Sequence, residues 1–213
     1  MLASAYKQTV KQGLQSVPML SVTLPIADLF GTRGLYLNTR STAPKWAREV
    51  SAEFYEPVTG EEFQLNAGLR VQGGASRNPN SSPKHSLSLR FRDSYNGDLK
   101  FELFPGSRVA RFDSVHLRAM YNNSWIHWSS SQRRRGTMIR DQWMRDSLID
   151  MGRLDAGGGR FVCLFLHGMF WGVYNLQERA EAAHCAAWHG GDSIDYDARN
   201  GSEFVDGTTT AWN

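Results

Sequence analysis

The chain has 213 residues, of which 41% are hydrophobic and 21% are charged, a composition that indicates a folded globular protein and excludes a disordered one. Its 24 basic and 21 acidic residues give a net charge of +3. This excess fits a small anionic ligand, but it is too weak to indicate a nucleic-acid partner. No apolar run approaches the roughly 18 residues of a membrane span, and the polar N-terminus lacks the apolar core of a signal peptide.

The first half of the chain is expected to be mostly β. Residues 1–17 are predicted to form a linker or a short helix, and a single domain is predicted over 18–213. In the clearest strand pattern, Leu87, Leu89 and Phe91 point one way while serines and arginines point the other. Further strands are predicted at 20–25, 34–37, 50–55, 63–65, 69–71 and 114–118.

The second half is expected to begin with one long helix over 137–151. Thr137 is a suitable N-cap, and Gly152 is suited to end the helix. An apolar stripe at helical spacing is predicted to face the core, formed by Met144, Leu148 and Met151. A hairpin of strands 161–166 and 170–174 and a short helix at 180–188 follow. The predicted fold class is therefore α+β, a mostly antiparallel sheet followed by one long helix and a hairpin.

The stretch 71–91 is the first candidate site. Gly73 and Gly74 allow the backbone to approach a ligand, while Ser76, Arg77 and Lys84 supply donors for anionic oxygens. The residues alone favour a plainer interpretation, a hairpin with a solvated polar loop, because neither a Walker pattern nor a GxGxxG motif is present.

The remaining reactive residues carry weaker signals. The six histidines show no compact ligand spacing, so packing or surface roles are favoured over metal binding. Cys163 lies in an apolar run and is expected to be a buried small hydrophobe, while its pairing with Cys185 stays open. Glu178, directly after the hairpin, can accept hydrogen bonds from a ligand or hold an arginine. The aromatic content also leaves a carbohydrate-active enzyme as a minor alternative.

Several segments in order resemble the CotH kinase family, named for the spore coat protein H of endospore formers. Examples are AGLRVQGGASR, PKHSLSLRF and LFLHGMFWGVYNLQER, and the full set covers 67–77, 83–91, 115–118, 121–125, 139–141, 164–179 and 205–207. The long pattern is similar to that of large bacterial members. The resemblance runs from about Pro18 to the end of the chain, and it reverses the preference for a plain hairpin at 71–91.

The resemblance implies an atypical protein kinase that uses ATP with Mg or Mn to phosphorylate serines of surface or coat proteins, at the cell surface or outside the cell. The sheet would then correspond to the N-lobe side of a kinase-like fold. Lys84 would meet the phosphates, and Gly73, Gly74, Ser76 and Arg77 would shape the loop beside them. Glu178 would lie near the base and ribose, while Arg118, Arg140 and Asp141 would be supporting residues.

The sequence departs from the family pattern in two places. His167 and Gly168 replace the usual Asn-Gly turn, and Arg179-Ala180-Glu181 follows Glu178 where an Asp is usual. The catalytic and metal-binding Asp motifs of the family are expected further downstream than Asn213. We therefore expect the rest of a larger polypeptide to exist, and this chain to be inactive by itself. The alternative is a non-catalytic cell-surface structural or adhesion module that binds through the aromatic residues of 121–128.

Overall fold

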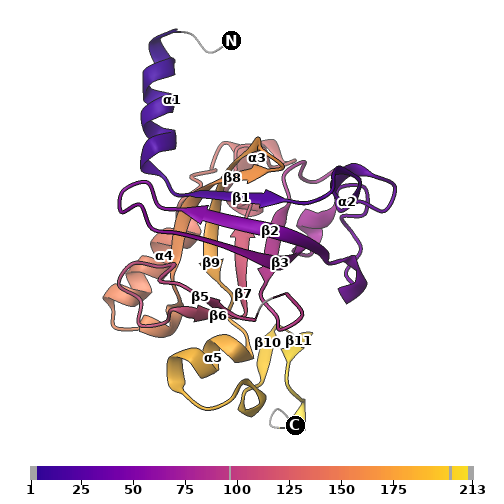
Figure 1. Ribbon diagram of the computed structural model, residues 1–213, viewed down its shortest axis with the longest axis vertical. Coiled ribbons are helices and arrows are strands. Elements are labelled where there is room, and N and C mark those ends of the chain that lie inside the picture. The colour runs from indigo at the N-terminus through magenta and orange to yellow at the C-terminus, as the bar shows by residue number, and fades with distance from the viewer. Residues whose placement is uncertain (1–3, 96, 202, 211–213) are drawn as a thin grey trace.

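Seven strands close into a barrel in the order β1-β2-β3-β4-β7-β9-β8, as the computed structural model shows (Figure 1). The structure describes residues 4–95, 97–201 and 203–210. Neighbouring strands are antiparallel, except that β1 pairs in parallel with β8 and thereby joins the two ends of the sheet. The barrel strands are β1 (Met19–Thr23), β2 (Arg48–Tyr55), β3 (Glu62–Gln72), β4 (Ser86–Arg90), β7 (Ser114–Arg118), β8 (Gly159–Leu166) and β9 (Met169–Glu178).

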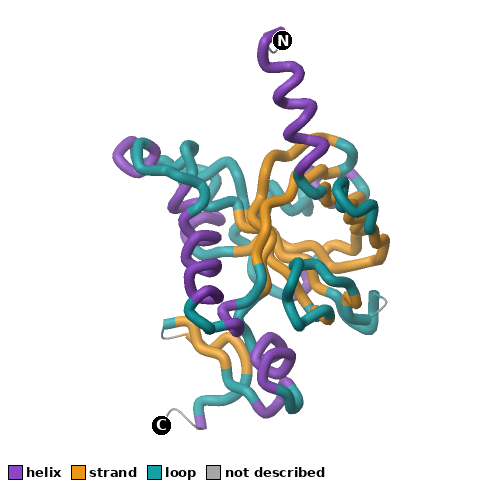
Figure 2. Tube along the Cα trace, turned by 90° about the vertical axis from the view of Figure 1, so that its left-hand side faces the viewer, coloured by secondary structure: helices purple, strands orange, loops and turns teal. Residues whose placement is uncertain are grey.

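Helices and two small hairpins surround the barrel. In both views α1 projects away from it, while α5 and the β10–β11 hairpin lie at the opposite end of the molecule (Figures 1 and 2). Among the described helices, none has the length and apolar character needed to cross a membrane. These elements are α1 (Ser4–Ser16), α2 (Ile26–Phe30), α3 (Ser130–Arg133), α4 (Arg140–Asp150), α5 (Ala182–His189), β5 (Leu99–Lys100), β6 (Arg111–Phe112), β10 (Ala198–Asn200) and β11 (Glu203–Asp206).

Alternate residues of the seven strands fill the barrel interior. Side chains of successive strand residues point to opposite faces, so each strand contributes every second residue to the core. Each large apolar side chain buried in this way contributes about 1.5–3 kcal/mol to stability. The interior residues, all at most 2% exposed, include Leu20, Val22, Ala52, Phe54, Leu69, Leu87, Leu89, Leu117, Leu164, Leu166 and Leu176.

The predicted fold class was wrong. The structure is a closed seven-stranded barrel with few helices, not a mostly antiparallel sheet followed by one long helix and a hairpin in the manner of a kinase N-lobe. Alternation identifies which residues face inward, but it does not show that β1 meets β8 some 140 positions later, from Met19 to Cys163. Residues 34–37 form turns, and the two predicted strands 63–65 and 69–71 are parts of one strand, β3.

The predicted long helix is shorter and less apolar than expected. It begins at Arg140, and Thr137 is not its cap, because Met138 with a φ of 59° interrupts the helical path. No residue of α4 is buried, and Met144 and Met151 of the predicted stripe are 48% and 70% exposed. Polar side chains of α4 contact the barrel instead, for example Gln142, which donates to the carbonyl of Gly159 at 2.8 Å.

Other local predictions are confirmed. The hairpin β8–β9 turns at His167 and Gly168, whose φ angles of 50° and 77° are those of a two-residue turn with both central residues left-handed. Gly152, with a φ of 84°, follows the end of α4, and α5 occupies the position of the predicted short helix. Cys163 is buried as expected, and both cysteines are free.

Candidate functional site

The outer face of strands β4, β7 and β9 is polar and yet buried. Ser88 and Asn175 are fully buried, and Gln177 is 1% exposed. Part of the cover comes from α4, where Gln142 accepts a hydrogen bond from the Asn175 amide at 2.8 Å. Polar groups are costly to bury without partners, so a buried polar face points to a site rather than to packing.

A cleft of about 470 Å³ lies over this face, within the size range of small-molecule sites. Its walls come from β3, β4, β7 and β9 of the barrel, from α4, and from the β10–β11 hairpin. The lining residues are Gln72, Gly73, Ser76, Ser86, His116, Arg118, Tyr121, Asn122, Arg145, Gln177, Glu178, Arg179, Ala180, Arg199, Asn200 and Val205.

Four arginines make the cleft strongly basic. Arg118 pairs with Asp141 at 2.7 Å and Arg179 pairs with Glu181 at 2.7 Å, so two of the positive charges are partly balanced. Arg145 instead donates to the carbonyl of Ala156 at 2.6 Å, which leaves its charge without a carboxylate at that contact. Burial lowers the pKa of Arg145, as does the nearby charge of Arg118, so an anion placed between them would relieve both effects.

His116 lies among these arginines and is kept neutral. Burial, and then the positive charges of Arg179 and Arg118, lower its pKa to about 3. Its Nε2 atom is buried without a hydrogen-bond partner, as are Ser88 Oγ and Arg90 Nε nearby on the same sheet face. Of these three residues only His116 lines the cleft, and the surrounding arginines are what favour a ligand rich in anionic oxygens.

Gly73 and Ser76, two of the predicted site residues, lie at the rim of the cleft. The φ of Gly73 is +118°, and a Cβ atom at this position would lie 2.2 Å from Ser76 Oγ. Glycine is therefore required for the turn that brings this loop to the rim. Gly74 is exposed and does not line the cleft.

Arg77 is buried and holds two loops together. Its Nε donates to the carbonyl of Gly73 at 2.5 Å, and its Nη1 donates to the carbonyls of Thr39 and Ser41 at 3.1 and 2.9 Å. The guanidinium is thus occupied by backbone carbonyls, and the residue is not part of the cleft lining. The structure gives Arg77 a supporting position behind the rim.

Lys84 also lies outside the cleft lining. It precedes β4 rather than lying on the strand, and its Nζ donates to the carbonyl of Val173 at 2.5 Å and lies 4.2 Å from the centre of the Tyr174 ring. Burial lowers its pKa to about 8. The lysine therefore packs against β9, and the structure does not bring it together with Gly73, Ser76 and Arg118.

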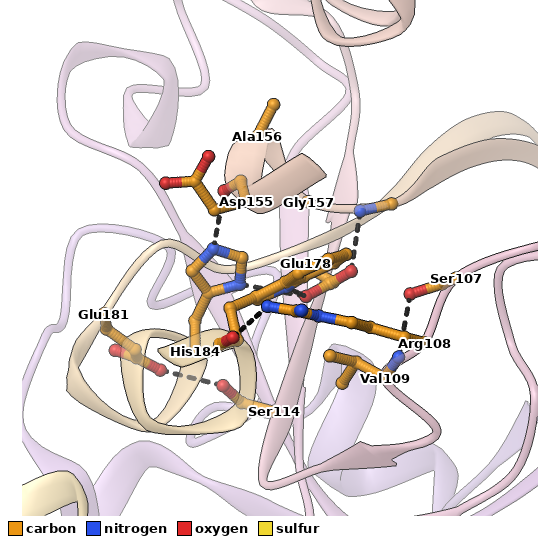
Figure 3. A network of polar contacts seen from close by, with 12 residues as sticks. Ser107, Arg108, Val109, Ser114, Asp155, Ala156, Gly157, Glu178, Glu181 and His184 are labelled. Carbon is orange, nitrogen blue, oxygen red and sulfur yellow. Dashed lines mark hydrogen bonds and ion pairs between the residues drawn. The ribbon is translucent and has the colours of Figure 1, made fainter. Parts of the chain in front are cut away.

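Glu178 lines the cleft, but its carboxylate is fully engaged on the side of α5 (Figure 3). It accepts hydrogen bonds from the Gly158 N–H at 2.6 Å, from His184 Nδ1 at 2.9 Å and from Trp188 Nε1 at 2.9 Å. The other ring nitrogen of His184 faces the carbonyl of Asp155 at 3.0 Å. Because both ring nitrogens face acceptors, the hydrogen bonds to Glu178 and Asp155 outweigh burial and raise the pKa of His184, and the pair fastens α5 to the barrel.

The predicted supporting residues separate into two groups. Arg118 of β7 and Asp141 of α4 come together in the ion pair described above, and the Asn123 amide also donates to Asp141 at 3.3 Å. Arg140 is exposed and lies outside the cleft lining, and its Nη2 donates to the carbonyl of Arg135 at 3.1 Å. Asp141 therefore anchors an arginine of the cleft and not Lys84.

Sequence reasoning missed most of the cleft, including His116, Arg145 and Arg179. A signal was present in the polar residues that alternate with the apolar ones along β4, β7 and β9. Such alternation is typical of a strand with one exposed face, and only the chain packed over these residues shows that they are buried. Arg145 belongs to a charged group on the helix, together with Arg140, Asp141 and Asp146, and such a group usually faces solvent.

The cleft offers donors for phosphate oxygens but no assembled metal site. Within the part of the chain that the structure describes, no three His, Cys, Asp or Glu side chains meet in a group that could hold a metal ion. A comparison with curated proteins finds no match. The family model described as CotH kinase protein matches residues 69–205, which is well over half of the chain and covers β4, β7, β9 and β10 completely and β3 and β11 in part. The chain therefore belongs to the CotH kinase protein family.

Proposed function

We propose that the cleft receives the phosphate groups of ATP, and that the protein of which this domain is a part transfers phosphate to serines of surface or coat proteins. The domain is proposed to extend over residues 18–213, with localisation at the cell surface or outside the cell by analogy with the family. The observation that carries the proposal is the convergence of four arginines on a cleft that is also lined by His116, whose Nε2 is buried without a partner.

The chemistry of the lining supports a phosphate-bearing ligand. Arginine guanidinium groups form paired hydrogen bonds with phosphate oxygens, and each such charged bond contributes about 1.5–3 kcal/mol. Phosphoryl transfer depends on positive groups that hold the phosphates and stabilise the charge of the transition state. Arg118, oriented by Asp141, and Arg145, fixed by the Ala156 carbonyl, are held in place for this task.

Divalent metal, which the family implies, fits the described residues less well than phosphate does. Mg²⁺ and Mn²⁺ prefer carboxylate oxygens, and the carboxylates at the cleft are already engaged. Glu178 is bound to His184, and Asp141 and Glu181 are paired with arginines. These residues therefore do not fit the role of metal ligands.

Calorimetric titration with ATP, ADP and AMP tests the cleft directly. We expect the affinity to fall as phosphates are removed, and to fall at least about tenfold in Arg118→Ala. Arg111→Ala is the matched control. Arg111 forms an ion pair with Asp98 at 2.7 Å, as Arg118 does with Asp141, but it lies outside the cleft lining. Loss of binding in Lys84→Ala with full binding in Arg118→Ala would place the nucleotide elsewhere. Transfer of labelled phosphate to a protein acceptor is the test of the proposed activity.

A non-catalytic binding module is the second candidate. The exposed indoles of Trp125 and Trp128, 64% and 63% accessible, favour it, because large exposed aromatics are typical of interaction surfaces. A protein that binds ATP in the cleft without ever transferring phosphate, even as a longer gene product, would support this candidate over the kinase.

A further inference from the structure

Residues 121–140, named the excursion, form a long connection that leaves the barrel after β7 and ends at the first residue of α4. This connection has a defined structure. The backbone N–H of Met138 donates to the carbonyl of Asn123 at 3.0 Å, which ties the two ends of the excursion together. Arg133 donates from Nη1 to the carbonyls of His127 and Trp128 at 2.8 and 2.9 Å. Its first residues, Tyr121 and Asn122, line the cleft, so the excursion is continuous with the proposed phosphate site.

Two tryptophans of the excursion are exposed and fixed at the same time. Trp125 donates from Nε1 to the carbonyl of Gly136 at 2.6 Å, and Trp128 donates from Nε1 to the hydroxyl of Tyr121 at 3.0 Å. The Tyr121, His127 and Trp128 rings also pack in sequence, with centroid distances of 4.8 and 5.5 Å. Preordered aromatic side chains of this kind lose little entropy on binding and often dominate interfaces.

The excursion is basic throughout. No aspartate or glutamate occurs between Asp113 and Asp141, and Asp141 is already paired with Arg118. Within residues 121–140 four arginines have exposed side chains: Arg133, Arg134, Arg135 and Arg140. Their charges are not balanced by any residue of the excursion itself, so a partner with negative charge is complementary to it.

We propose that Trp125, Trp128, Arg133, Arg134, Arg135 and Arg140 form a docking surface for an acidic polypeptide segment of a partner protein. Guanidinium groups bind carboxylates in paired hydrogen bonds, and the fixed indoles cover the apolar parts of the segment. Both indole N–H groups are already bonded within the protein, so the rings are held in place rather than free to insert into a bilayer. The inference rests on the proposed function only in that the docked segment would lie next to the phosphate cleft.

The test measures binding of a fluorescein-labelled peptide of about ten residues that alternates Glu and Gly, an extended reach of about 33 Å. Fluorescence anisotropy is recorded at low and high salt, without nucleotide, for the full chain. We expect binding that weakens with salt and falls at least about tenfold in the double variant Arg134→Glu with Arg135→Glu. The milder pair Arg134→Gln with Arg135→Gln should show a smaller loss, and circular dichroism establishes that both variants are folded.

Arg33→Glu with Arg40→Glu is the matched control, since both are exposed arginines that lie outside the proposed surface, in the segment after α2. Equal loss in this control would overturn the proposal by showing that only the net charge of the protein matters. Equal binding of a Lys-Gly peptide would overturn it by showing that negative charge on the peptide is not recognised. Binding to phosphatidylserine vesicles in the absence of peptide binding would also overturn it, in favour of a membrane surface. ATP affinity measured in parallel should be unchanged in the Arg134/Arg135 variants, which separates failure of the docking surface from failure of the phosphate cleft.

Discussion

The ion pair between Glu178 and His184 is predicted to be a main attachment of α5 to the barrel. Its side chains are 3% and 8% exposed, and Glu178 accepts three hydrogen bonds, from His184, Trp188 and the N–H of Gly158. In Glu178→Gln the amide N–H₂ would face the donor atoms of His184 and Trp188. Each hydrogen bond to a charged group contributes about 1.5–3 kcal/mol, and breaking a buried pair costs about 3–5 kcal/mol. We expect the free energy of unfolding to fall by about 3–5 kcal/mol.

The effect depends on pH in a defined direction. Burial alone would raise the pKa of Glu178 and lower that of His184, but the hydrogen bonds of the pair outweigh burial, so the pKa of Glu178 is lowered and that of His184 is raised. The contribution of Glu178 is present above its unfolded pKa of about 4.5 and is lost as pH falls through the folded value. The contribution of His184 is present below its unfolded pKa of about 6.5 and is lost as pH rises through the folded value. The difference between wild type and variant is therefore largest between about pH 4.5 and 6.5.

Urea denaturation followed by tryptophan fluorescence, repeated across this pH range, measures the difference. Glu56→Gln is the matched control, because Glu56 is also buried and paired, but with an arginine, Arg160, rather than with a histidine. In this control the loss of stability should not become smaller as the pH rises through the pKa of His184. A loss below about 1 kcal/mol in Glu178→Gln, or one that does not change as His184 titrates, would refute the account of this pair.

Three further outcomes follow from the backbone and from Lys84. His167→Asn should raise the free energy of unfolding by roughly 0.5 kcal/mol, because both turn residues are left-handed and asparagine tolerates this conformation better; an unchanged denaturation midpoint would contradict this. Gly73→Ala should lower stability by about 1 kcal/mol or more and weaken ATP binding, since its Cβ would meet Ser76 Oγ at a φ of +118°; Gly60→Ala, at an exposed turn with open space around it, separates the strain of positive φ from the clash. Burial lowers the pKa of Lys84 to about 8, so between about pH 8 and 10.5 the unfolded state binds more protons at this lysine than the folded state does. Stability, measured by denaturation, should therefore rise with pH over this range in wild type but not in Lys84→Met.

The contrast between Lys84 and Arg118 shows how far sequence reasoning reached into the site. Both are basic residues in segments that resemble the family, and nothing in their spacing separates them. In the structure Lys84 lies against Val173 and Tyr174, while Arg118 points into the cleft and is held by Asp141. The loop before β4 directs the Lys84 side chain toward β9, and α4 supplies the Asp141 that holds the Arg118 side chain. Both side-chain positions therefore depend on packing between distant parts of the chain.

Local sequence patterns were sufficient to predict several strands, one helix end and one hairpin turn of this protein. Alternation along 86–92 and 114–118 identified strands, Gly152 marked the end of a helix, and His167 with Gly168 marked a hairpin, because each of these features depends on a few neighbouring residues. The ordered segments also identified the family. The closure of the barrel between β1 and β8, and the burial of its polar outer face beneath a basic cleft, become visible in the three-dimensional structure alone. These features join residues far apart in the chain, and their free energy comes from contacts that no local pattern specifies.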